Sequence, residues 1–412
     1  MKFLKQEVTQ TIKWVQNPLY QDTYTIHDRF NAFSEETIQQ VHRFQQTHSL
    51  YTNTPLISLR HLSRYLNVSE ILVKDESKRF GLEAFKVMGG IYAIGKYLAN
   101  KLDTKIKELS FKDLQSEEIE KKLEKITFIS ATDGNHGRGI AWAAKELGQK
   151  SKIFLPKGSS KRRLKAIQEA GAYAEITDLN YDDTVAMCEN LAKENDWVLV
   201  QDTAWEGYEE IPLWIMQGYA SIAKEMIDEM ENDDKDPPTH LILQAGVGSF
   251  AASIATYFKA YYKDRSPKII LVEPNLADCY YRSFSSKTPS MQTVTGHMNS
   301  IMAGLCCGKP SILAYDLLSK QTEFSFSCID EIAALGMRVL GNPIGNDLKV
   351  VSGESGAVSL GLLFYLRNYE NDTICKTLEL DENSRIAMIN TEGATDLQQY
   401  LNVVWKGYLA NK

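Results

Sequence analysis

The chain has 412 residues, more than one ordinary hydrophobic core holds, so two packed domains are expected. Apolar residues make up 43% and charged residues 24%, which is the balance of a soluble globular protein. The net charge of -7 argues against nucleic acid as the main partner, because binding to phosphate backbones needs clustered Lys and Arg.

Short apolar runs alternate with helical patterns along most of the chain. Several of these runs are apolar throughout, as expected of parallel strands that are buried on both faces. Helical patterns at 161–172 and 181–195 lie between such runs. The alternation predicts βαβ units and a doubly wound α/β fold. The predicted strands are residues 71–76, 126–130, 151–156, 172–177, 197–202, 240–245, 268–273 and 385–390.

The first candidate functional residue is Lys86, in the segment GLEAFKVMGG at 81–90. It follows Phe85 and begins a helical pattern that is rich in small residues. Partial burial would favour the neutral amine, which is the form that attacks an aldehyde. The alternative is a lysine whose stem lies along apolar surface while its ammonium group stays in water.

The segment ATDGNHG at 131–137 follows a predicted strand and begins a helix. Such a turn offers backbone N–H groups and the positive end of the helix dipole to an anion. Asn135 can donate to a ring oxygen, and Asp133 can move a proton. The alternative is a helix cap made by Asp133 or Asn135. We expect His136 to be a core residue or to support the site, and not to act as the catalytic base.

A glycine turn follows the strand predicted at 240–245 and leads into another helical pattern. The turn consists of Gly246, Val247, Gly248 and Ser249. Its successive N–H groups and the serine hydroxyl suit a phosphate. With Ala251 and the later Glu273, the same segment also fits the dinucleotide-binding pattern GxGxxA. A tight turn without a ligand is the remaining alternative.

The last candidate is Thr391, directly after the strand predicted at 385–390. A hydroxyl at the carboxyl end of a strand can reach a ring bound at the edge of an open α/β sheet. As a neutral partner it would leave a pyridine nitrogen unprotonated, which favours elimination over reactions that need a long-lived carbanion. The alternative is a polar turn residue.

The sequence predicts neither a membrane segment nor a metal site. No run approaches the roughly 18 apolar residues of a membrane helix, and the first residues lack the apolar core of a secretory signal. The expected compartment is therefore the cytoplasm. The six cysteines show no CxxC spacing, which argues against structural zinc. A disulfide between Cys279 and Cys306 or Cys307 remains open.

Together, SKRFGLEAFK (77–86), ATDGNHG, AGVGS and a terminal strand followed by a hydroxyl resemble the fold-type II pyridoxal-phosphate enzymes. This is the group of threonine dehydratase and the tryptophan synthase β-subunit. Segments such as DTAWEGYEEIPLWIMQGY (202–219) and SGESGAV (352–358) resemble the diaminopropionate ammonia-lyases more closely. The resemblance implies two doubly wound open-sheet α/β domains with the cofactor in the interdomain cleft. Residues 1–88 and 233–412 would form the large cofactor-binding domain, and 89–232 the small domain.

The resemblance also implies a role for each candidate residue. Lys86 would form the internal aldimine with pyridoxal 5′-phosphate, and Asn135 would contact the phenolic oxygen of the cofactor. The turn 246–249 would hold the phosphate, and Thr391 would face the pyridine nitrogen. Two carboxylates suit a substrate with a second amine, because ammonium groups pair with carboxylates. The implied substrate-binding residues are Thr132, Asp133 and Asp202.

The implied reaction is elimination of ammonia from D- or L-2,3-diaminopropionate, through an aminoacrylate, to pyruvate and two molecules of ammonia. Lys86 would remove the Cα proton of the L isomer, and Asp133 that of the D isomer from the opposite face. Three alternatives stay open: a serine or threonine dehydratase of the same fold, an NAD-dependent oxidoreductase, and a non-catalytic regulator that binds an amino acid or the cofactor. A homodimer is expected from the resemblance and from the base rate for soluble enzymes.

Overall fold

The structure, a computed structural model, describes residues 11–21, 28–369 and 372–410. Its internal contacts divide the chain into two compact units. The first unit comprises Met1–Asn31, Thr54–Ala84 and Glu225–Lys412, and the second comprises Ala32–Asn53 and Phe85–Lys224. These boundaries differ from the division expected at residues 88 and 233, most of all because Ala32–Asn53 belongs to the second unit.

Helix α3 (Glu35–Gln46) explains why this segment belongs there. The ring of Phe44 stacks on that of Phe111, with 5.1 Å between the centroids. The side-chain amide of Gln45 donates to the carbonyls of Met88, at 2.9 Å, and Gly218, at 3.1 Å. Because these partners are distant in sequence, no local pattern around α3 predicts its placement.

The first unit is built on a seven-stranded sheet with the order β1-β10-β9-β8-β11-β3-β2. The five central strands are parallel, and the two edge strands run antiparallel to their neighbours. The predicted strands β3, β8, β9 and β11 are confirmed, whereas β1, β2 and β10 are not among those predicted. The strands are β1 (Ile12–Gln16), β2 (Leu56–Ser58), β3 (Glu70–Asp75), β8 (His240–Gln244), β9 (Lys268–Pro274), β10 (Thr322–Cys328) and β11 (Arg385–Asn390).

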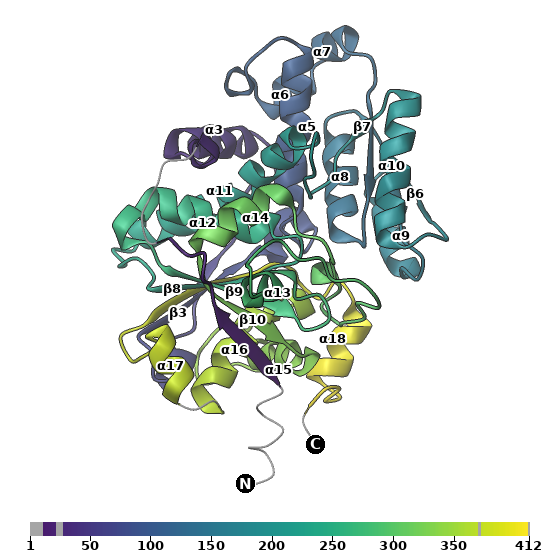
Figure 1. The fold of residues 1–412 in the computed structure, drawn as a ribbon. Coiled ribbons are helices and arrows are strands. Elements are labelled where there is room, and N and C mark those ends of the chain that lie inside the picture. The colour runs from purple at the N-terminus through teal and green to yellow at the C-terminus, as the bar shows by residue number, and fades with distance from the viewer. Residues whose placement is uncertain (1–10, 22–27, 370–371, 411–412) are drawn as a thin grey trace. The chain divides into compact units, whose positions relative to one another are not determined.

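Helices cover both faces of this sheet, with α12 and α14 on one side and α15 and α16 on the other (Figure 1). The core between the sheet and helices α15 and α16 includes Ile71, Ile242, Met337 and Leu360, all fully or almost fully buried. The helices of this unit are α2 (Asp28–Asn31), α4 (Arg60–Tyr65), α12 (Ser249–Tyr262), α13 (Cys279–Ser285), α14 (Ile312–Gln321), α15 (Asp330–Gly341), α16 (Glu354–Asn368), α17 (Asp372–Leu378) and α18 (Leu397–Val404). Short 3-10 turns occur at Glu76–Gly81, Lys263–Arg265 and Ala303–Leu305.

The strand order of the first unit reverses between β8 and β11. The chain passes from β8 to β9 and β10 on one side, then returns to β11 on the other side of β8. Open α/β sheets bind ligands outside the carboxyl ends of the strands at such a switch point. The turn 246–249 follows β8 and Thr391 follows β11, so both candidates lie at this place.

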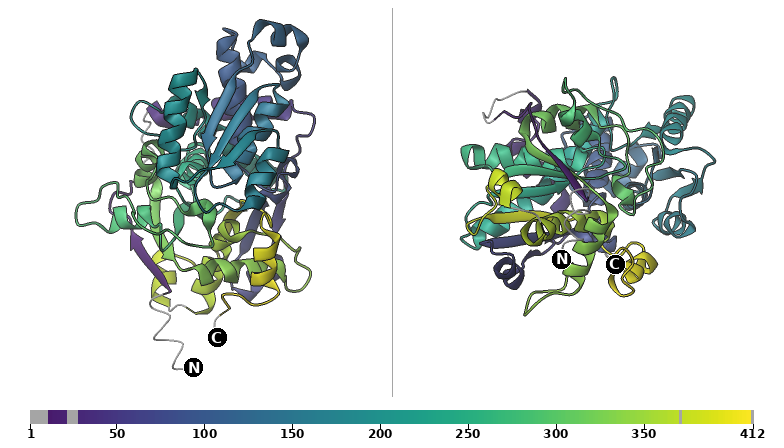
Figure 2. Two further views of the ribbon diagram at one scale, coloured as in Figure 1. Left: turned by 90° about the vertical axis from the view of Figure 1, so that its right-hand side faces the viewer. Right: turned by 60° about the horizontal axis from the view of Figure 1, so that its bottom comes forward.

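The second unit is built on four parallel strands in the order β6-β5-β4-β7, seen side by side in Figure 2. All four are predicted, although the strand predicted at 197–202 has only two residues in β7. The strands are β4 (Thr127–Ala131), β5 (Lys150–Leu155), β6 (Tyr173–Ile176) and β7 (Val198–Leu199). Besides α3, the helices are α5 (Val87–Lys101), α6 (Phe111–Leu114), α7 (Glu117–Lys122), α8 (Asn135–Glu146), α9 (Lys161–Glu169), α10 (Tyr181–Asn195) and the part of α11 (Glu210–Asn232) up to Lys224, with a 3-10 turn at Ile106–Glu108. The rest of α11, from Glu225, belongs to the first unit.

This smaller sheet has a switch point of its own, between β4 and β7. The chain passes from β4 to β5 and β6, then returns to β7 on the other side of β4. Asp133 lies in the loop after β4, and Asp202 lies in the loop after β7. The two acidic candidates therefore lie at the carboxyl ends of neighbouring strands.

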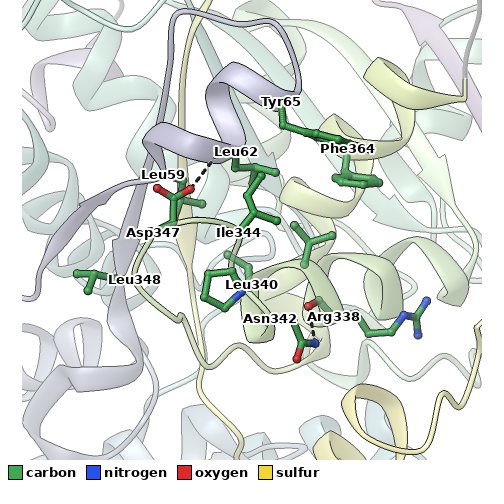
Figure 3. Close-up of a pocket in the computed structure, with 12 residues that line it drawn as sticks. Leu59, Leu62, Tyr65, Arg338, Leu340, Asn342, Ile344, Asp347, Leu348 and Phe364 are labelled. Carbon is green, nitrogen blue, oxygen red and sulfur yellow. Dashed lines mark hydrogen bonds between the residues drawn. The ribbon is translucent and has the colours of Figure 1, made fainter.

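A separate apolar groove of about 430 Å³ lies on the first unit, lined by residues of α4, α15 and α16 and of the segment after α15. Figure 3 shows Leu62, Leu340 and Ile344 pointing into it. The carboxylate of Asp347 accepts hydrogen bonds from the backbone N–H groups of His61 and Leu62, at 2.9 Å each. The residues described as lining this groove include none of the candidate site residues. In the described part of the chain, no helix combines the length and apolar character needed to span a bilayer.

Candidate active site

Lys86 is the N-cap of α5, and the packing of α5 on α8 sets its position. A Cβ atom at Gly139 of α8 would lie 2.9 Å from the backbone nitrogen of Val87. The two helices can approach this closely only because residue 139 is glycine. The side chain of Lys86 is 21% exposed, and its Nζ donates to Oδ2 of Asp202 at 2.5 Å.

Asp202 supplies an ionised carboxylate beside this amine. Its side chain is buried, and burial alone would raise its pKa. The attraction of His136 and Lys86 outweighs burial and lowers the pKa of Asp202 to about 2. The carboxylate is therefore charged at neutral pH, where it accepts hydrogen bonds and cannot donate a proton.

His136 supports this arrangement from the first turn of α8. Its Nε2 lies 2.8 Å from the carbonyl oxygen of Val200. Because a carbonyl only accepts, Nε2 carries the hydrogen, and Nδ1 faces Oδ2 of Asp202 at 3.7 Å. Burial lowers the pKa of His136, and the negative charge of Asp202 partly offsets this effect. This geometry fits the supporting role expected for His136.

Thr132, which the cap alternative does not name, holds the loop 131–135 and the first turn of α8. The hydroxyl oxygen of Thr132 accepts from the backbone N–H groups of Gly134, at 2.9 Å, and Gly137, at 3.0 Å. The oxygen of Thr132 is therefore used by the loop, and its hydroxyl proton is what it can offer to another group. Asn135 is the first residue of α8, at the end of this loop.

Asp133 is half-buried in the same loop, and its environment differs from that of Asp202. Burial raises its pKa, and the positive charges of Lys86 and Arg163 reduce this effect without cancelling it. A raised pKa favours the protonated carboxyl group over the carboxylate at a given pH. The pKa values of the two acids are thus shifted in opposite directions, upward for Asp133 and downward for Asp202.

In the first unit, the glycine turn leads directly into helix α12. Gly248 is the N-cap with a φ of 94°, a conformation that favours glycine, and Ser249 begins the helix. The N–H groups of the turn and of the first helical turn, with the positive end of the helix dipole, suit a phosphate.

Thr391, at the same switch point, is oriented by Gln244, the last residue of β8. The side-chain nitrogen of Gln244 donates to the carbonyl of Ile389 and to Oγ1 of Thr391, both at 3.0 Å. The hydroxyl of Ser359 donates to the side-chain amide oxygen of Gln244 at 3.2 Å. Because the carbonyl of Ile389 only accepts, the orientation of the amide is fixed, and the proton of Thr391 is left for a group other than Gln244. Gln244 is not among the predicted site residues, although a buried glutamine ending an apolar strand is a usable signal.

Glu273 does not serve as the acid of a dinucleotide site. It is fully buried, and its carboxylate accepts from the backbone N–H groups of Tyr280, at 2.8 Å, and Tyr281, at 2.7 Å. Burial raises the pKa of Glu273 to about 8 in spite of these bonds. The carboxylate holds the beginning of α13, and the oxidoreductase alternative loses the residue on which it depends.

The cysteines are all free thiols, so the structure holds no disulfide at Cys279. Its Sγ lies 3.2 Å from the carbonyl oxygen of Cys307 and 3.1 Å from that of Gly308. Among the residues that the structure describes, no group of three or more His, Cys, Asp or Glu side chains could hold a metal ion.

The residues present fit pyridoxal phosphate in the type of group that each offers. Lys86 provides an amine, the turn 246–249 a set of N–H groups for a phosphate, and Thr391 a hydroxyl with its proton available. The sequence pattern of the family described as pyridoxal-phosphate-dependent enzymes matches residues 48–392.

Comparison with known proteins narrows this assignment. The diaminopropionate ammonia-lyase of Salmonella typhimurium is 48% identical over 359 residues, which is 87% of this chain and 89% of that protein. The crystal structure of selenomethionine-labelled holo diaminopropionate ammonia-lyase from Escherichia coli has a TM-score of 0.90 at 43% identity, covering 97% of this chain and 98% of that one. The structure of the same E. coli enzyme with an aminoacrylate–PLP azomethine reaction intermediate has a TM-score of 0.88, at the same identity and coverage. The chain therefore belongs to the fold-type II pyridoxal-phosphate-dependent enzymes, and these relatives within the family are diaminopropionate ammonia-lyases.

Proposed function

We propose that the protein eliminates ammonia from 2,3-diaminopropionate and yields pyruvate and two molecules of ammonia. This proposal rests on two carboxylates near Lys86, which are those of Asp133 and Asp202. A second amine on the substrate would find an ionised partner in Asp202, whereas a hydroxy amino acid has no group that needs one. The named activity of the relatives from Salmonella typhimurium and Escherichia coli supports the same reaction.

The cofactor is pyridoxal 5′-phosphate, which when bound withdraws electrons from the Cα of an attached amino acid. Lys86 would hold its aldehyde covalently, and Asn135 would donate to its phenolic oxygen. The turn 246–249 would bind its phosphate. Thr391 would donate its hydroxyl proton to the ring nitrogen, which then stays uncharged.

The residues of the chain would divide the proton transfers between them. The amine of Lys86, once free, would remove the Cα proton of the L isomer, and Asp133 that of the D isomer. The amine on Cβ must carry three protons to depart as ammonia, and Asp133 or Lys86 would return a proton to it if it has lost one. Asp202 would bind the second ammonium group without donating a proton, because its pKa of about 2 keeps it ionised. Thr132 would donate its hydroxyl proton to the substrate.

A serine or threonine dehydratase of the same fold is the second candidate function. The two activities are separated by incubating the protein with diaminopropionate or with serine and measuring pyruvate and ammonia. We expect two ammonia per pyruvate from diaminopropionate and a kcat/KM at least about 10²-fold above that for serine. A preference for serine would instead support the dehydratase, and turnover of neither substrate would support a binding regulator.

We also propose that the protein is a cytoplasmic homodimer. Closed dimers are the most frequent assembly of soluble enzymes. Sedimentation velocity would then give a mass of twice the 46.6 kDa of the chain. A mass of one chain at micromolar concentration would contradict the dimer.

A further inference from the structure

The carbonyl of Val247, in the middle of the glycine turn, is held from two directions. It accepts a hydrogen bond from the hydroxyl of Tyr280 at 3.0 Å and another from the backbone N–H of Ser311 at 2.9 Å. The peptide bond between Val247 and Gly248 is trans. In a trans peptide the C=O and N–H point to opposite sides. The N–H of Gly248 therefore points away from Tyr280 and Ser311.

Tyr280 is itself held in place by β9 and the neighbouring elements. Its side chain is fully buried, and its backbone N–H donates to Oε1 of Glu273 at 2.8 Å. Its ring stacks on that of Tyr315, with 6.2 Å between the centroids and 28° between the ring planes. Burial raises the pKa of Tyr280 well above 10, so the hydroxyl keeps its proton and donates it. The hydroxyl is thus a fixed donor on the protein side of the turn.

Gly248 is matched to this tyrosine. A Cβ atom at residue 248 would overlap the hydroxyl oxygen of Tyr280. The positive φ of Gly248 independently favours glycine there. The turn can keep its shape against Tyr280 only while residue 248 lacks a side chain.

From these contacts we infer that Tyr280 is a positioning residue for the cofactor phosphate: its bond to the Val247 carbonyl aims the Gly248 N–H at the phosphate. The inference rests on the proposed cofactor site. It assigns no contact between Tyr280 and the cofactor, and the effect passes entirely through the peptide between residues 247 and 248.

The test compares Tyr280→Phe with Tyr281→Phe, which removes the same hydroxyl from the adjacent, half-exposed residue. The full-length chain, freed of cofactor, is titrated with pyridoxal 5′-phosphate and, separately, with pyridoxal, which lacks the phosphate. We expect Tyr280→Phe to raise the dissociation constant for pyridoxal phosphate about fivefold to tenfold, the usual effect of losing one hydrogen bond. The constant for pyridoxal should stay within about twofold of wild type, and Tyr281→Phe should change neither.

The two ligands separate an effect on the phosphate from a general loss of stability. If Tyr280→Phe weakened the binding of pyridoxal phosphate and of pyridoxal equally, the inference would be overturned. The hydroxyl would then stabilise the fold as a whole and not the phosphate site. An unchanged ratio of the two constants, with only a lower melting temperature of the apoprotein, would also overturn it. Failure of the wild-type chain to bind pyridoxal phosphate would instead refute the proposed cofactor site.

Discussion

The two switch points of the molecule are built from opposite kinds of groups. At the β4/β7 switch point, Asp133 and Asp202 lie near Lys86, and their pKa values shift in opposite directions. At the β8/β11 switch point the candidate groups are neutral: the peptides of the turn 246–249, the amide of Gln244 and the hydroxyl of Thr391. Both places follow the same topological rule, yet only at the β4/β7 switch point do the candidate residues titrate.

This difference separates the tasks that a pyridoxal-phosphate enzyme needs. Neutral, fixed hydrogen-bond donors can hold a phosphate and a ring without exchanging protons, so their effect changes little with pH. A lysine and two acids with different pKa values can move protons and recognise a charged substrate. Substitutions in the ionic group should therefore change rates and specificity strongly, and those in the neutral group should change binding moderately.

The largest effect is expected from Asp202→Asn. An amide cannot pair with the second ammonium of diaminopropionate as a carboxylate does, so kcat/KM for that substrate should fall about 10²- to 10³-fold. The kcat/KM for serine, which has no second amine, should fall less than about tenfold. Steady-state kinetics with both substrates would measure this, and equal losses would remove Asp202 from substrate recognition.

Asp133→Asn should distinguish the two isomers of the substrate. Loss of a positioned base costs about 10²-fold or more, and we expect this for the D isomer. The L isomer, with Lys86 as base, should lose about tenfold or less, the cost of a weaker acid for the leaving ammonia. Turnover of the separate isomers checks this, and a similar loss for both would contradict a base on each face.

A substitution in the neutral group should have a smaller effect. Thr391→Val removes the hydroxyl while keeping a branched side chain of similar size. The loss of one hydrogen bond should weaken pyridoxal phosphate binding about fivefold to tenfold. Thr391→Ser, which keeps the hydroxyl, serves as the control and should bind nearly as wild type. A loss in Thr391→Ser as large as that in Thr391→Val would show that the methyl group matters, not the hydroxyl.

The smallest effect is expected from Arg163→Gln, which should shift the pH dependence of kcat/KM for the D isomer. The positive charge of Arg163 lowers the pKa of Asp133, so its removal should let that pKa rise further. As a base, Asp133 must be ionised, and the acid limb of kcat/KM for the D isomer should move to higher pH. The rate above that limb should not change. Arg162→Gln, on the exposed neighbour, is the matched control, and a movement to lower pH would contradict the assignment.

Much of the fold follows from local sequence patterns. The elements that local patterns fail to predict are those whose side chains have partners distant in the sequence. The strand–turn–helix segment around 240–262 is readable because its apolar strand and glycine turn are contiguous. Strand β10 cannot be predicted in this way, because its serines interrupt the apolar pattern. In the structure, Ser325 donates to Glu273 and Ser327 to Asp278, partners about 50 residues away in sequence. No local pattern reveals that these serines are buried and satisfied.

The site shows the same limit. Lys86, Asp133 and the turn 246–249 stand out because each lies in a short segment with suitable chemistry. Asp202 is suggested only by the family resemblance, since 116 residues separate it from Lys86, the amine that it contacts. Tyr280 escapes prediction for the same reason, because its role arises from contacts that only the folded chain creates.

The most direct test of the central claim is chemical trapping of the cofactor on Lys86. The purified protein with bound pyridoxal phosphate is reduced with borohydride, digested, and analysed by mass spectrometry. We expect the pyridoxyl-phosphate label on the peptide that contains Lys86, and no label there in Lys86→Ala. Lys96→Ala, a change to another lysine of α5, should leave the labelling intact. A label on a different lysine of the wild-type chain, with Lys86 unmodified, would contradict the account.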